Sequence, residues 1–150
     1  MYIIYTSISG NTRSFAKRLQ KFAAAEHEKN ADYPIIQLKE IHDNSLPEKE
    51  TEPFFAMVPT YLEGGNGVDN GTQEILTESL REHIEYAANA ELCLGIIGSG
   101  NKNFNHQYCL TAKQYAQAFA VPFLADFELR GNSFEIETIY HKLCQFLEMR

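Results

Sequence analysis

The sequence has few cysteines, no long apolar segment and no excess of positive charge, and each of these absences excludes a class of protein. Its three cysteines, Cys93, Cys109 and Cys144, are far apart and form no C-x-x-C pair. Their spacing therefore indicates neither a metal site nor a dithiol redox motif. Because free cysteine behaves as a small apolar residue, we expect three buried thiols.

Membranes and nucleic acids are disfavoured as partners. No apolar run approaches the roughly 20 residues of a membrane-spanning helix. The net charge of −7 disfavours nucleic acid, because its phosphates require a basic surface. A secretory signal has a basic region followed by a long apolar stretch, and the first residues do not show this pattern. We therefore expect a cytoplasmic protein.

Short apolar runs and helical patterns alternate along the chain, whose 150 residues suit one domain spanning residues 1–150. This alternation predicts an α/β fold, a three-layer sandwich in which helices cover both faces of a five-stranded parallel sheet. Residues 39–52 are charged and lack a helical pattern, so we expect no full helix between strands two and three. The strands are expected at about 2–5, 34–38, 53–58, 92–97 and 122–128, and the helices at about 12–27, 72–86, 106–119 and from 132 or 133 onward.

Three unusual loops follow strands one, three and four, at the sheet edge where parallel sheets bind their ligands. The first loop, residues 6–12, combines hydroxyl side chains with one glycine and one asparagine, and it has no charged residue. A strand that turns into a helix through such a loop directs backbone N–H groups and the positive end of the helix dipole at one point. The loop therefore predicts a phosphate site that works through hydrogen bonds and not through salt bridges.

Several familiar phosphate and catalytic motifs are excluded by residue type. Gly10 is the only glycine in the first loop, so the dinucleotide pattern G-x-G-x-x-G is absent there. Neither the P-loop pattern G-x-x-x-x-G-K-[ST] nor the nucleophile motif G-x-S-x-G is present. The five histidines show no ligand spacing: His106 borders the third loop, and four are expected at the surface, namely His27, His42, His83 and His141.

A planar heterocycle that carries a phosphate fits the remaining features, and FMN is the natural candidate. Tyr61 and Phe104, in the second and third loops, are expected to flank the flat ring. Two plainer interpretations stay open, in which Tyr61 folds over its own loop and Phe104 staples onto the following helix. The candidate cofactor-binding residues are Ser7, Ile8, Ser9, Gly10, Asn11, Thr12, Pro59, Thr60, Tyr61, Gly64, Gly65, Ser99, Gly100, Asn101, Asn103, Phe104 and Tyr108.

Four segments resemble the NrdI family, the flavodoxin-like activators of class Ib ribonucleotide reductase. They are residues 9–12, residues 58–61 with the following Gly64 and Gly65, residues 98–104 and residues 127–131. The first is general to flavodoxins, whereas the third and fourth are more specific, and the resemblance covers essentially the whole chain. It implies a flavodoxin-like fold with strand order 2-1-3-4-5 and about four helices, shortened between strands two and three.

The resemblance also implies a function, that of an oxidant-generating flavoprotein and not of an enzyme with a conventional substrate. Reduced FMN passes electrons from an unidentified donor to O2, and the superoxide or peroxide enters the small subunit of class Ib ribonucleotide reductase. There it oxidises a dimanganese centre that generates a tyrosyl radical. No catalytic side chain is expected in this chain, because the chemistry takes place on the flavin, and no metal ligand is expected, because the metal belongs to the partner. A general one-electron flavodoxin and a non-redox binding module on the same scaffold remain the alternatives.

Overall fold

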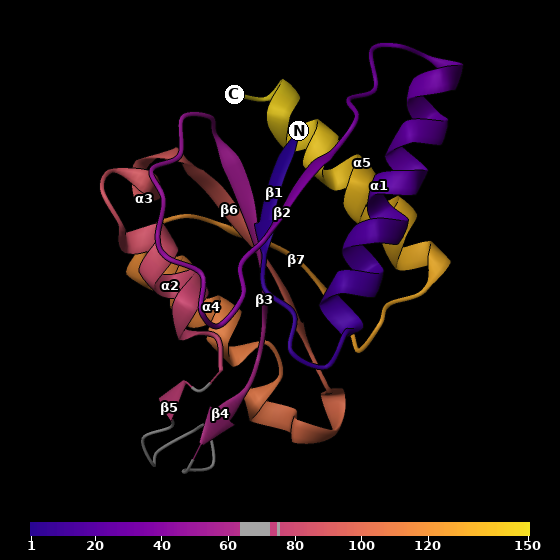
Figure 1. Cartoon of the computed structure of the whole chain (residues 1–150). Helices are drawn as coiled ribbons and strands as arrows, with labels where there is room; N and C mark the ends of the chain where they lie inside the picture. Colours follow the sequence, from indigo (N-terminus) through magenta and orange to yellow (C-terminus); the bar gives the residue numbers. More distant parts are fainter. Residues whose placement is uncertain (64–72, 75) are drawn as a thin grey trace.

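Five parallel strands form one sheet between two layers of helices (Figure 1). This computed structural model describes residues 1–63, 73–74 and 76–150. The strand order, β2-β1-β3-β6-β7, confirms the predicted order 2-1-3-4-5. The sheet strands are β1 (Tyr2–Tyr5), β2 (Gln37–Glu40), β3 (Phe54–Pro59), β6 (Cys93–Gly100) and β7 (Phe123–Glu128). The other elements are the helices α1 (Asn11–Lys29), α2 (Glu78–Glu85), α3 (Asn89–Leu92), α4 (Leu110–Ala118) and α5 (Ser133–Glu148), the 3-10 helix η1 (Lys102–Gln107), and the antiparallel pair β4 (Leu62–Glu63) and β5 (Gln73–Glu74).

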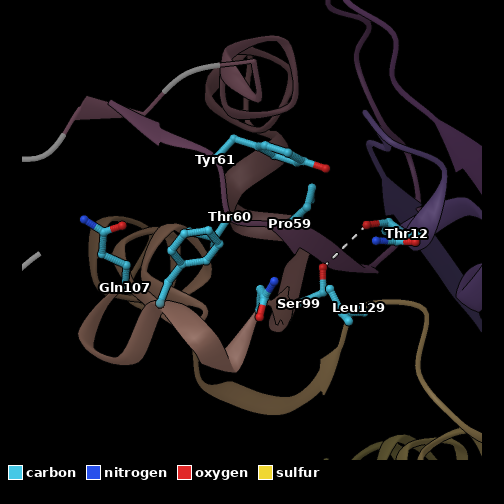
Figure 2. Close-up of a pocket in the computed structure, with 11 residues that line it drawn as sticks. Thr12, Pro59, Thr60, Tyr61, Ser99, Gln107 and Leu129 are labelled. Carbon is cyan, nitrogen blue, oxygen red and sulfur yellow. Dashed lines mark hydrogen bonds between the residues drawn. The ribbon is translucent and has the colours of Figure 1, made fainter. Parts of the chain in front are cut away.

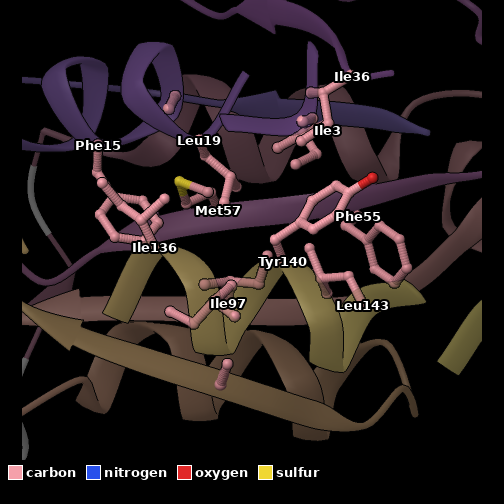
Figure 3. Close-up of a cluster of buried hydrophobic side chains, with 14 of the residues drawn as sticks. Ile3, Phe15, Leu19, Ile36, Phe55, Met57, Ile97, Ile136, Tyr140 and Leu143 are labelled. Atoms are coloured by element: carbon pink, nitrogen blue, oxygen red, sulfur yellow. The ribbon is translucent and has the colours of Figure 1, made fainter. Parts of the chain in front are cut away.

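The central strand β3 is buried on both faces because its side chains alternate between two cores. Phe55 and Met57 lie in the core that α1 and α5 cover (Figure 3). Ala56 and Val58 lie in the opposite core, against α2 and α4. Figure 1 shows the same division, with α1 and α5 on one side of the sheet and α2 and α4 on the other.

Aromatic stacking fixes the first turns of α1 against the last strand. The rings of Phe15 and Phe127 are stacked, with their centroids 3.7 Å apart. Gly131 follows close by: its φ is 73°, and a Cβ atom there would lie 2.5 Å from the Phe15 ring. Only glycine satisfies both conditions, since other residues rarely adopt this backbone conformation. The start of α1 and the turn before α5 are therefore held together.

The second helix is shorter than its apolar pattern predicts. It begins at Glu78 and not near residue 72, because residues 73–74 form β5. Leu76, which the helical spacing places on the buried face, has a left-handed φ of 68° and is 43% exposed. Likewise η1 occupies the start of the predicted third helix, so that α4 begins only at Leu110. Segments as short as β4, β5 and α3 carry no periodicity and are not predicted.

The fourth strand of the sheet is longer than predicted. β6 extends through Gly100, so residues 98–100 belong to the sheet and not to a loop. A Cβ atom on Gly98 would lie 2.8 Å from the Ala112 Cβ atom of α4, and one on Gly100 would lie 2.9 Å from the Cys109 nitrogen. These glycines therefore allow α4 to approach the strand closely, which is a role that a loop interpretation does not anticipate.

The link between β2 and β3 contains no helix, as predicted. The strand before it occupies Gln37–Glu40 instead of residues 34–38, so it includes the first two residues of the expected loop. Where a helix is missing, side chains hold the link to the rest of the fold: Thr6 donates a hydrogen bond to the carbonyl oxygen of Ile41 (2.8 Å), and Ser79 donates one to that of Asp43 (2.8 Å).

A buried carboxylate, that of Glu50, anchors the end of this link. One of its oxygens lies 2.7 Å from His83 Nε2 and accepts a hydrogen bond from the Lys39 ammonium group at 2.8 Å. The other accepts one from the Tyr2 hydroxyl at 2.9 Å. The expectation that His83 lies at the surface is wrong, because its exposed fraction is only 1%. The buried imidazole instead satisfies the carboxylate, as buried polar groups require.

The three cysteines are buried free thiols, as predicted. Burial raises the pKa of Cys93 to about 11 and that of Cys109 to about 12, so both thiols are protonated near neutral pH. Over the described part of the chain, no helix has the length and apolar character needed to span a membrane. Nor do three or more His, Cys, Asp or Glu side chains gather there in a way that could hold a metal ion.

Candidate functional site

A cavity of about 320 Å³ lies at the carboxyl ends of β1, β3 and β6 (Figure 2). Segments from four parts of the chain meet there, namely the start of α1, the end of β3, the end of β6 with η1, and the turn after β7. The lining residues are Asn11, Thr12, Pro59, Thr60, Tyr61, Ser99, Gly100, Asn101, Phe104, Gln107 and Leu129. Nine of these belong to the predicted set of cofactor-binding residues.

The first loop has the geometry of an anion site at a helix N-terminus. Gly10 precedes α1 with a φ of 94°, and the helix has no acidic residue in its first turn and no side-chain cap. The backbone N–H of Arg13 donates to Ser7 Oγ at 3.1 Å, which shapes the loop. Thr12 Oγ1 lies 3.5 Å from Ser99 Oγ, and both residues are buried. Hydroxyl groups from α1 and β6 thus meet at one end of the cavity, beside the positive end of the helix dipole.

The only cation within the first turn of α1, Arg13, is engaged elsewhere. Its guanidinium group donates to both carboxylate oxygens of Glu40 on β2, at 2.8 and 2.6 Å. The Tyr5 hydroxyl donates to the same carboxylate at 3.0 Å. Arg13 holds the pKa of Glu40 below its usual value, while burial and the bond to Glu40 raise the pKa of Tyr5 to about 12. Because Arg13 is paired with Glu40, this arrangement supports the expectation of a phosphate site that works through hydrogen bonds and not through a salt bridge.

The loop after β3 crosses toward the first loop. The Tyr61 hydroxyl lies 2.9 Å from Ser9 Oγ, and Figure 2 shows the ring extending over Pro59 toward the α1 side of the cavity. Thr60 Oγ1 accepts a hydrogen bond from the backbone N–H of Thr111 at 3.3 Å. Gly64 and Gly65, which are predicted to contact the cofactor, lie outside the described residues.

The third loop is rigidified by its own backbone and side chains. The Asn101 side-chain oxygen accepts from the backbone N–H of Asn103 at 2.9 Å, and the Phe104 N–H donates to the Asn101 carbonyl at 3.0 Å. Phe104 lines the cavity and is 62% exposed, so most of its side chain is open to solvent. The described residues of the cavity therefore include one aromatic side chain from each of the second and third loops.

These residues fit a phosphate-bearing aromatic cofactor. Uncharged hydroxyl and N–H donors lie at the α1 end, whereas Tyr61 and Phe104 supply aromatic surface. Gly100 also lines the cavity, and the direction in which a side chain would leave it is filled by the Cys109 backbone and the Tyr108 ring. Behind the wall, the buried Thr111 hydroxyl has no hydrogen-bond partner within the described structure. Such unsatisfied buried groups are few in folded proteins.

Six of the predicted residues that the structure describes do not line the cavity. Tyr108 is the clearest case: its hydroxyl donates to Asp126 at 2.9 Å, and its ring lies 5.7 Å from the Lys102 ammonium group. Burial raises the Tyr108 pKa, so this hydroxyl stays protonated. The others are Ser7, Ile8, Ser9, Gly10 and Asn103.

Two lining residues are absent from the predicted set. Leu129 lies in the turn after β7, within the segment 127–131 that resembles the NrdI family. That resemblance is the one signal in the sequence that could have found it. Gln107 ends η1, and nothing in its sequence surroundings distinguishes it from an ordinary polar helix residue. The site therefore has a fourth contributing segment that the strand-and-loop pattern does not reveal.

Comparison with known proteins gives one consistent result. The family model described as "NrdI Flavodoxin like" matches residues 3–141. An NrdI-like protein of Streptococcus pyogenes is 53% identical over 137 residues, covering 91% of this chain and 88% of that protein. Protein NrdI of Malacoplasma penetrans is 30% identical over 91% of this chain and 86% of its own length. Oxidised flavodoxin 2 from Bacillus cereus shares the fold, with a TM-score of 0.62 over 99% of this chain and 98% of that one, at 16% identity.

Proposed function

The chain belongs to the NrdI flavodoxin-like family, and from this premise we propose that its cavity binds FMN. We further propose that the protein generates an oxidant from O2 for the dimanganese small subunit of class Ib ribonucleotide reductase, with electrons from a separate donor. One observation carries the proposed binding of FMN: two uncharged residues at the N-terminus of α1 and two aromatic side chains line the same cavity. We expect the protein to act in the cytoplasm, with its reductase partner.

Different residues of the cavity are suited to bind the phosphate and the ring of FMN. The N–H groups at the start of α1, with the hydroxyl groups of Thr12 and Ser99, are suited to hold the phosphate. Tyr61 and Phe104 are suited to cover the ring and exclude water from it. Bound FMN supplies the one- and two-electron chemistry that no side chain of the cavity provides.

Binding of FMN is tested first, with the purified protein. Addition of FMN should give a yellow protein and quench the fluorescence of the free flavin with one-to-one stoichiometry. A protein that stays colourless after FMN addition and gel filtration would rule out every flavin-dependent function. Riboflavin serves as the matched ligand, because it has the same ring without the phosphate.

The partner is tested separately. Flavin-loaded protein is reduced, mixed with O2 and the manganese-loaded small subunit, and assayed for tyrosyl radical by electron paramagnetic resonance. The proposal expects radical well above the level of a control in which the flavin is omitted. Equal radical in both samples would leave a general electron-carrying flavodoxin as the better description.

A further inference from the structure

Leu129 has an unusual backbone for a leucine. Its φ of 54° is left-handed, a conformation that costs most residues other than glycine free energy. It is 45% exposed and lines the cavity, so burial in a core does not explain why leucine occupies the position. In the view of Figure 2, Tyr61 lies above Pro59, whereas Leu129 lies below it, beside Ser99.

The turn around Leu129 is held by hydrogen bonds on both sides. The Leu129 N–H donates to the Gly100 carbonyl of β6 at 2.9 Å, and the Gly131 N–H donates to the Glu128 carbonyl at 2.8 Å. Glu135 of α5 accepts from the Glu128 N–H at 3.2 Å. Strained conformations persist where the surroundings determine them in this way, and they concentrate at functional sites.

The same turn also holds the third loop. One carboxylate oxygen of Glu128 accepts a hydrogen bond from the backbone N–H of Lys102, at 2.9 Å. Lys102 begins η1, the helix that carries Phe104 and Gln107 into the cavity wall. Together with the bond between Leu129 and Gly100, this contact joins the end of β6 and the start of η1 to the end of β7 and the turn that follows it.

We propose that the turn between β7 and α5 is a fourth cofactor-contacting segment, in which Leu129 forms an apolar wall against the flavin and Glu128 positions the third loop. The inference rests on the proposed binding of FMN. It explains the strain: a glycine would adopt the same backbone more easily, but it would leave this side of the cavity without a wall. Glu128 acts through the loop and is a positioning residue.

The chain offers a matched control for the strained backbone. Ala120, just after α4, has the same left-handed φ of 54°, is exposed, and does not line the cavity. Glycine at either position should raise the thermal unfolding temperature of the FMN-free protein, because the strain is relieved. Only Leu129→Gly should weaken FMN binding, by about tenfold, because an apolar contact is lost. The change should also alter the visible circular dichroism of the bound flavin.

The two variants together decide the role of Leu129. FMN affinity and visible dichroism equal to wild type in Leu129→Gly would overturn the wall. A similar loss of affinity in Ala120→Gly would also overturn it, because the effect would then come from chain flexibility. If the wild type itself binds no FMN, the proposed function fails before this inference is tested.

Glu128 is tested by separating its hydrogen bond from its charge. Glu128→Gln retains an oxygen that can accept from the Lys102 N–H, whereas Glu128→Ala does not. FMN affinity should fall about tenfold in the alanine variant and stay within about threefold of wild type in the glutamine variant. Glu137→Ala removes an exposed carboxylate of α5 and serves as the control. Equal losses in both Glu128 variants would contradict a positioning role.

Discussion

The hydroxyl groups of Ser9 and Tyr61 lie 2.9 Å apart and join the first loop to the loop after β3. Ser9 is exposed and Tyr61 is half-buried, so the bond spans the rim of the cavity. It holds the hydroxyl end of Tyr61, whose side chain lines the cavity. The pair couples the loop before α1 to an aromatic side chain that lines the cavity.

Removal of this bond should weaken FMN binding modestly. Tyr61→Phe keeps the ring and loses the hydroxyl, so we expect a loss of about 1 kcal/mol, or roughly fivefold in Kd. Ser9→Ala should produce a similar or larger loss. In the double variant the two effects should be less than additive, because the residues share one interaction. Fluorescence titration of the four proteins measures this coupling, and strictly additive losses would show that the bond does not order the ring.

Asn11→Asp should separate the stability of α1 from its ability to bind phosphate. Asn11 begins α1 and lines the cavity. A negative charge there stabilises the helix through its dipole, by roughly 0.3–1 kcal/mol. The same charge repels a bound phosphate, so FMN affinity should fall by at least about tenfold. The affinity for riboflavin, which lacks the phosphate, should change little. Equal losses for both ligands would place the phosphate away from this helix.

The sequence predicts the sheet and the edge at which the cavity lies, because both depend on local patterns. Apolar runs of strand length and helical spacing are visible without tertiary information, and the capping box of Asn132 and Glu135 marks the start of α5 correctly. The cavity lies where the three unusual loops meet, as expected for parallel strands.

The misinterpreted parts depend on contacts that are distant in sequence. Gly98 and Gly100 have a loop-like composition, but they serve the close approach of α4 to β6. His83 follows no apolar or ligand pattern, yet it is buried because Glu50, distant in sequence, needs a partner. Leu129 lines the site through a left-handed backbone that hydrogen bonds from neighbouring elements impose. Local propensity does not contain this information.

The buried Glu50 carboxylate and its partners Lys39, Tyr2 and His83 should make the free energy of unfolding depend on pH in the acid range. Burial alone raises the Glu50 pKa, but bonds from Lys39, Tyr2 and His83 outweigh it, and the pKa lies below the usual 4.5. A carboxyl group whose pKa is lower in the folded protein than in the unfolded chain stabilises the fold at pH values above its unfolded pKa. This stabilisation is lost as the pH falls through the folded pKa.

Glu50→Gln should therefore destabilise the protein by about 3 kcal/mol at pH 7, because the buried network loses its charge. The difference from wild type should shrink below about pH 4. Urea unfolding at pH 7 and pH 3.5 measures it, with Glu52→Gln as the control for an exposed carboxylate. A difference that is the same at both pH values would show that the ionised carboxylate contributes no stability.

Gly100→Ala should damage the site more than a similar change at Gly10. A methyl group on Gly100 would lie 2.9 Å from the Cys109 nitrogen and 3.3 Å from the Tyr108 ring, so β6 and α4 must separate. We expect a loss of about 1–3 kcal/mol in stability and a clear loss of FMN affinity, because the cavity wall moves. A methyl group on Gly10 would meet no atom of another segment within 4 Å, so Gly10→Ala costs only its left-handed backbone, about 1 kcal/mol. Chemical denaturation and FMN titration of both variants test this order; equal stability losses would show that close packing of α4 on β6 is not what requires Gly100.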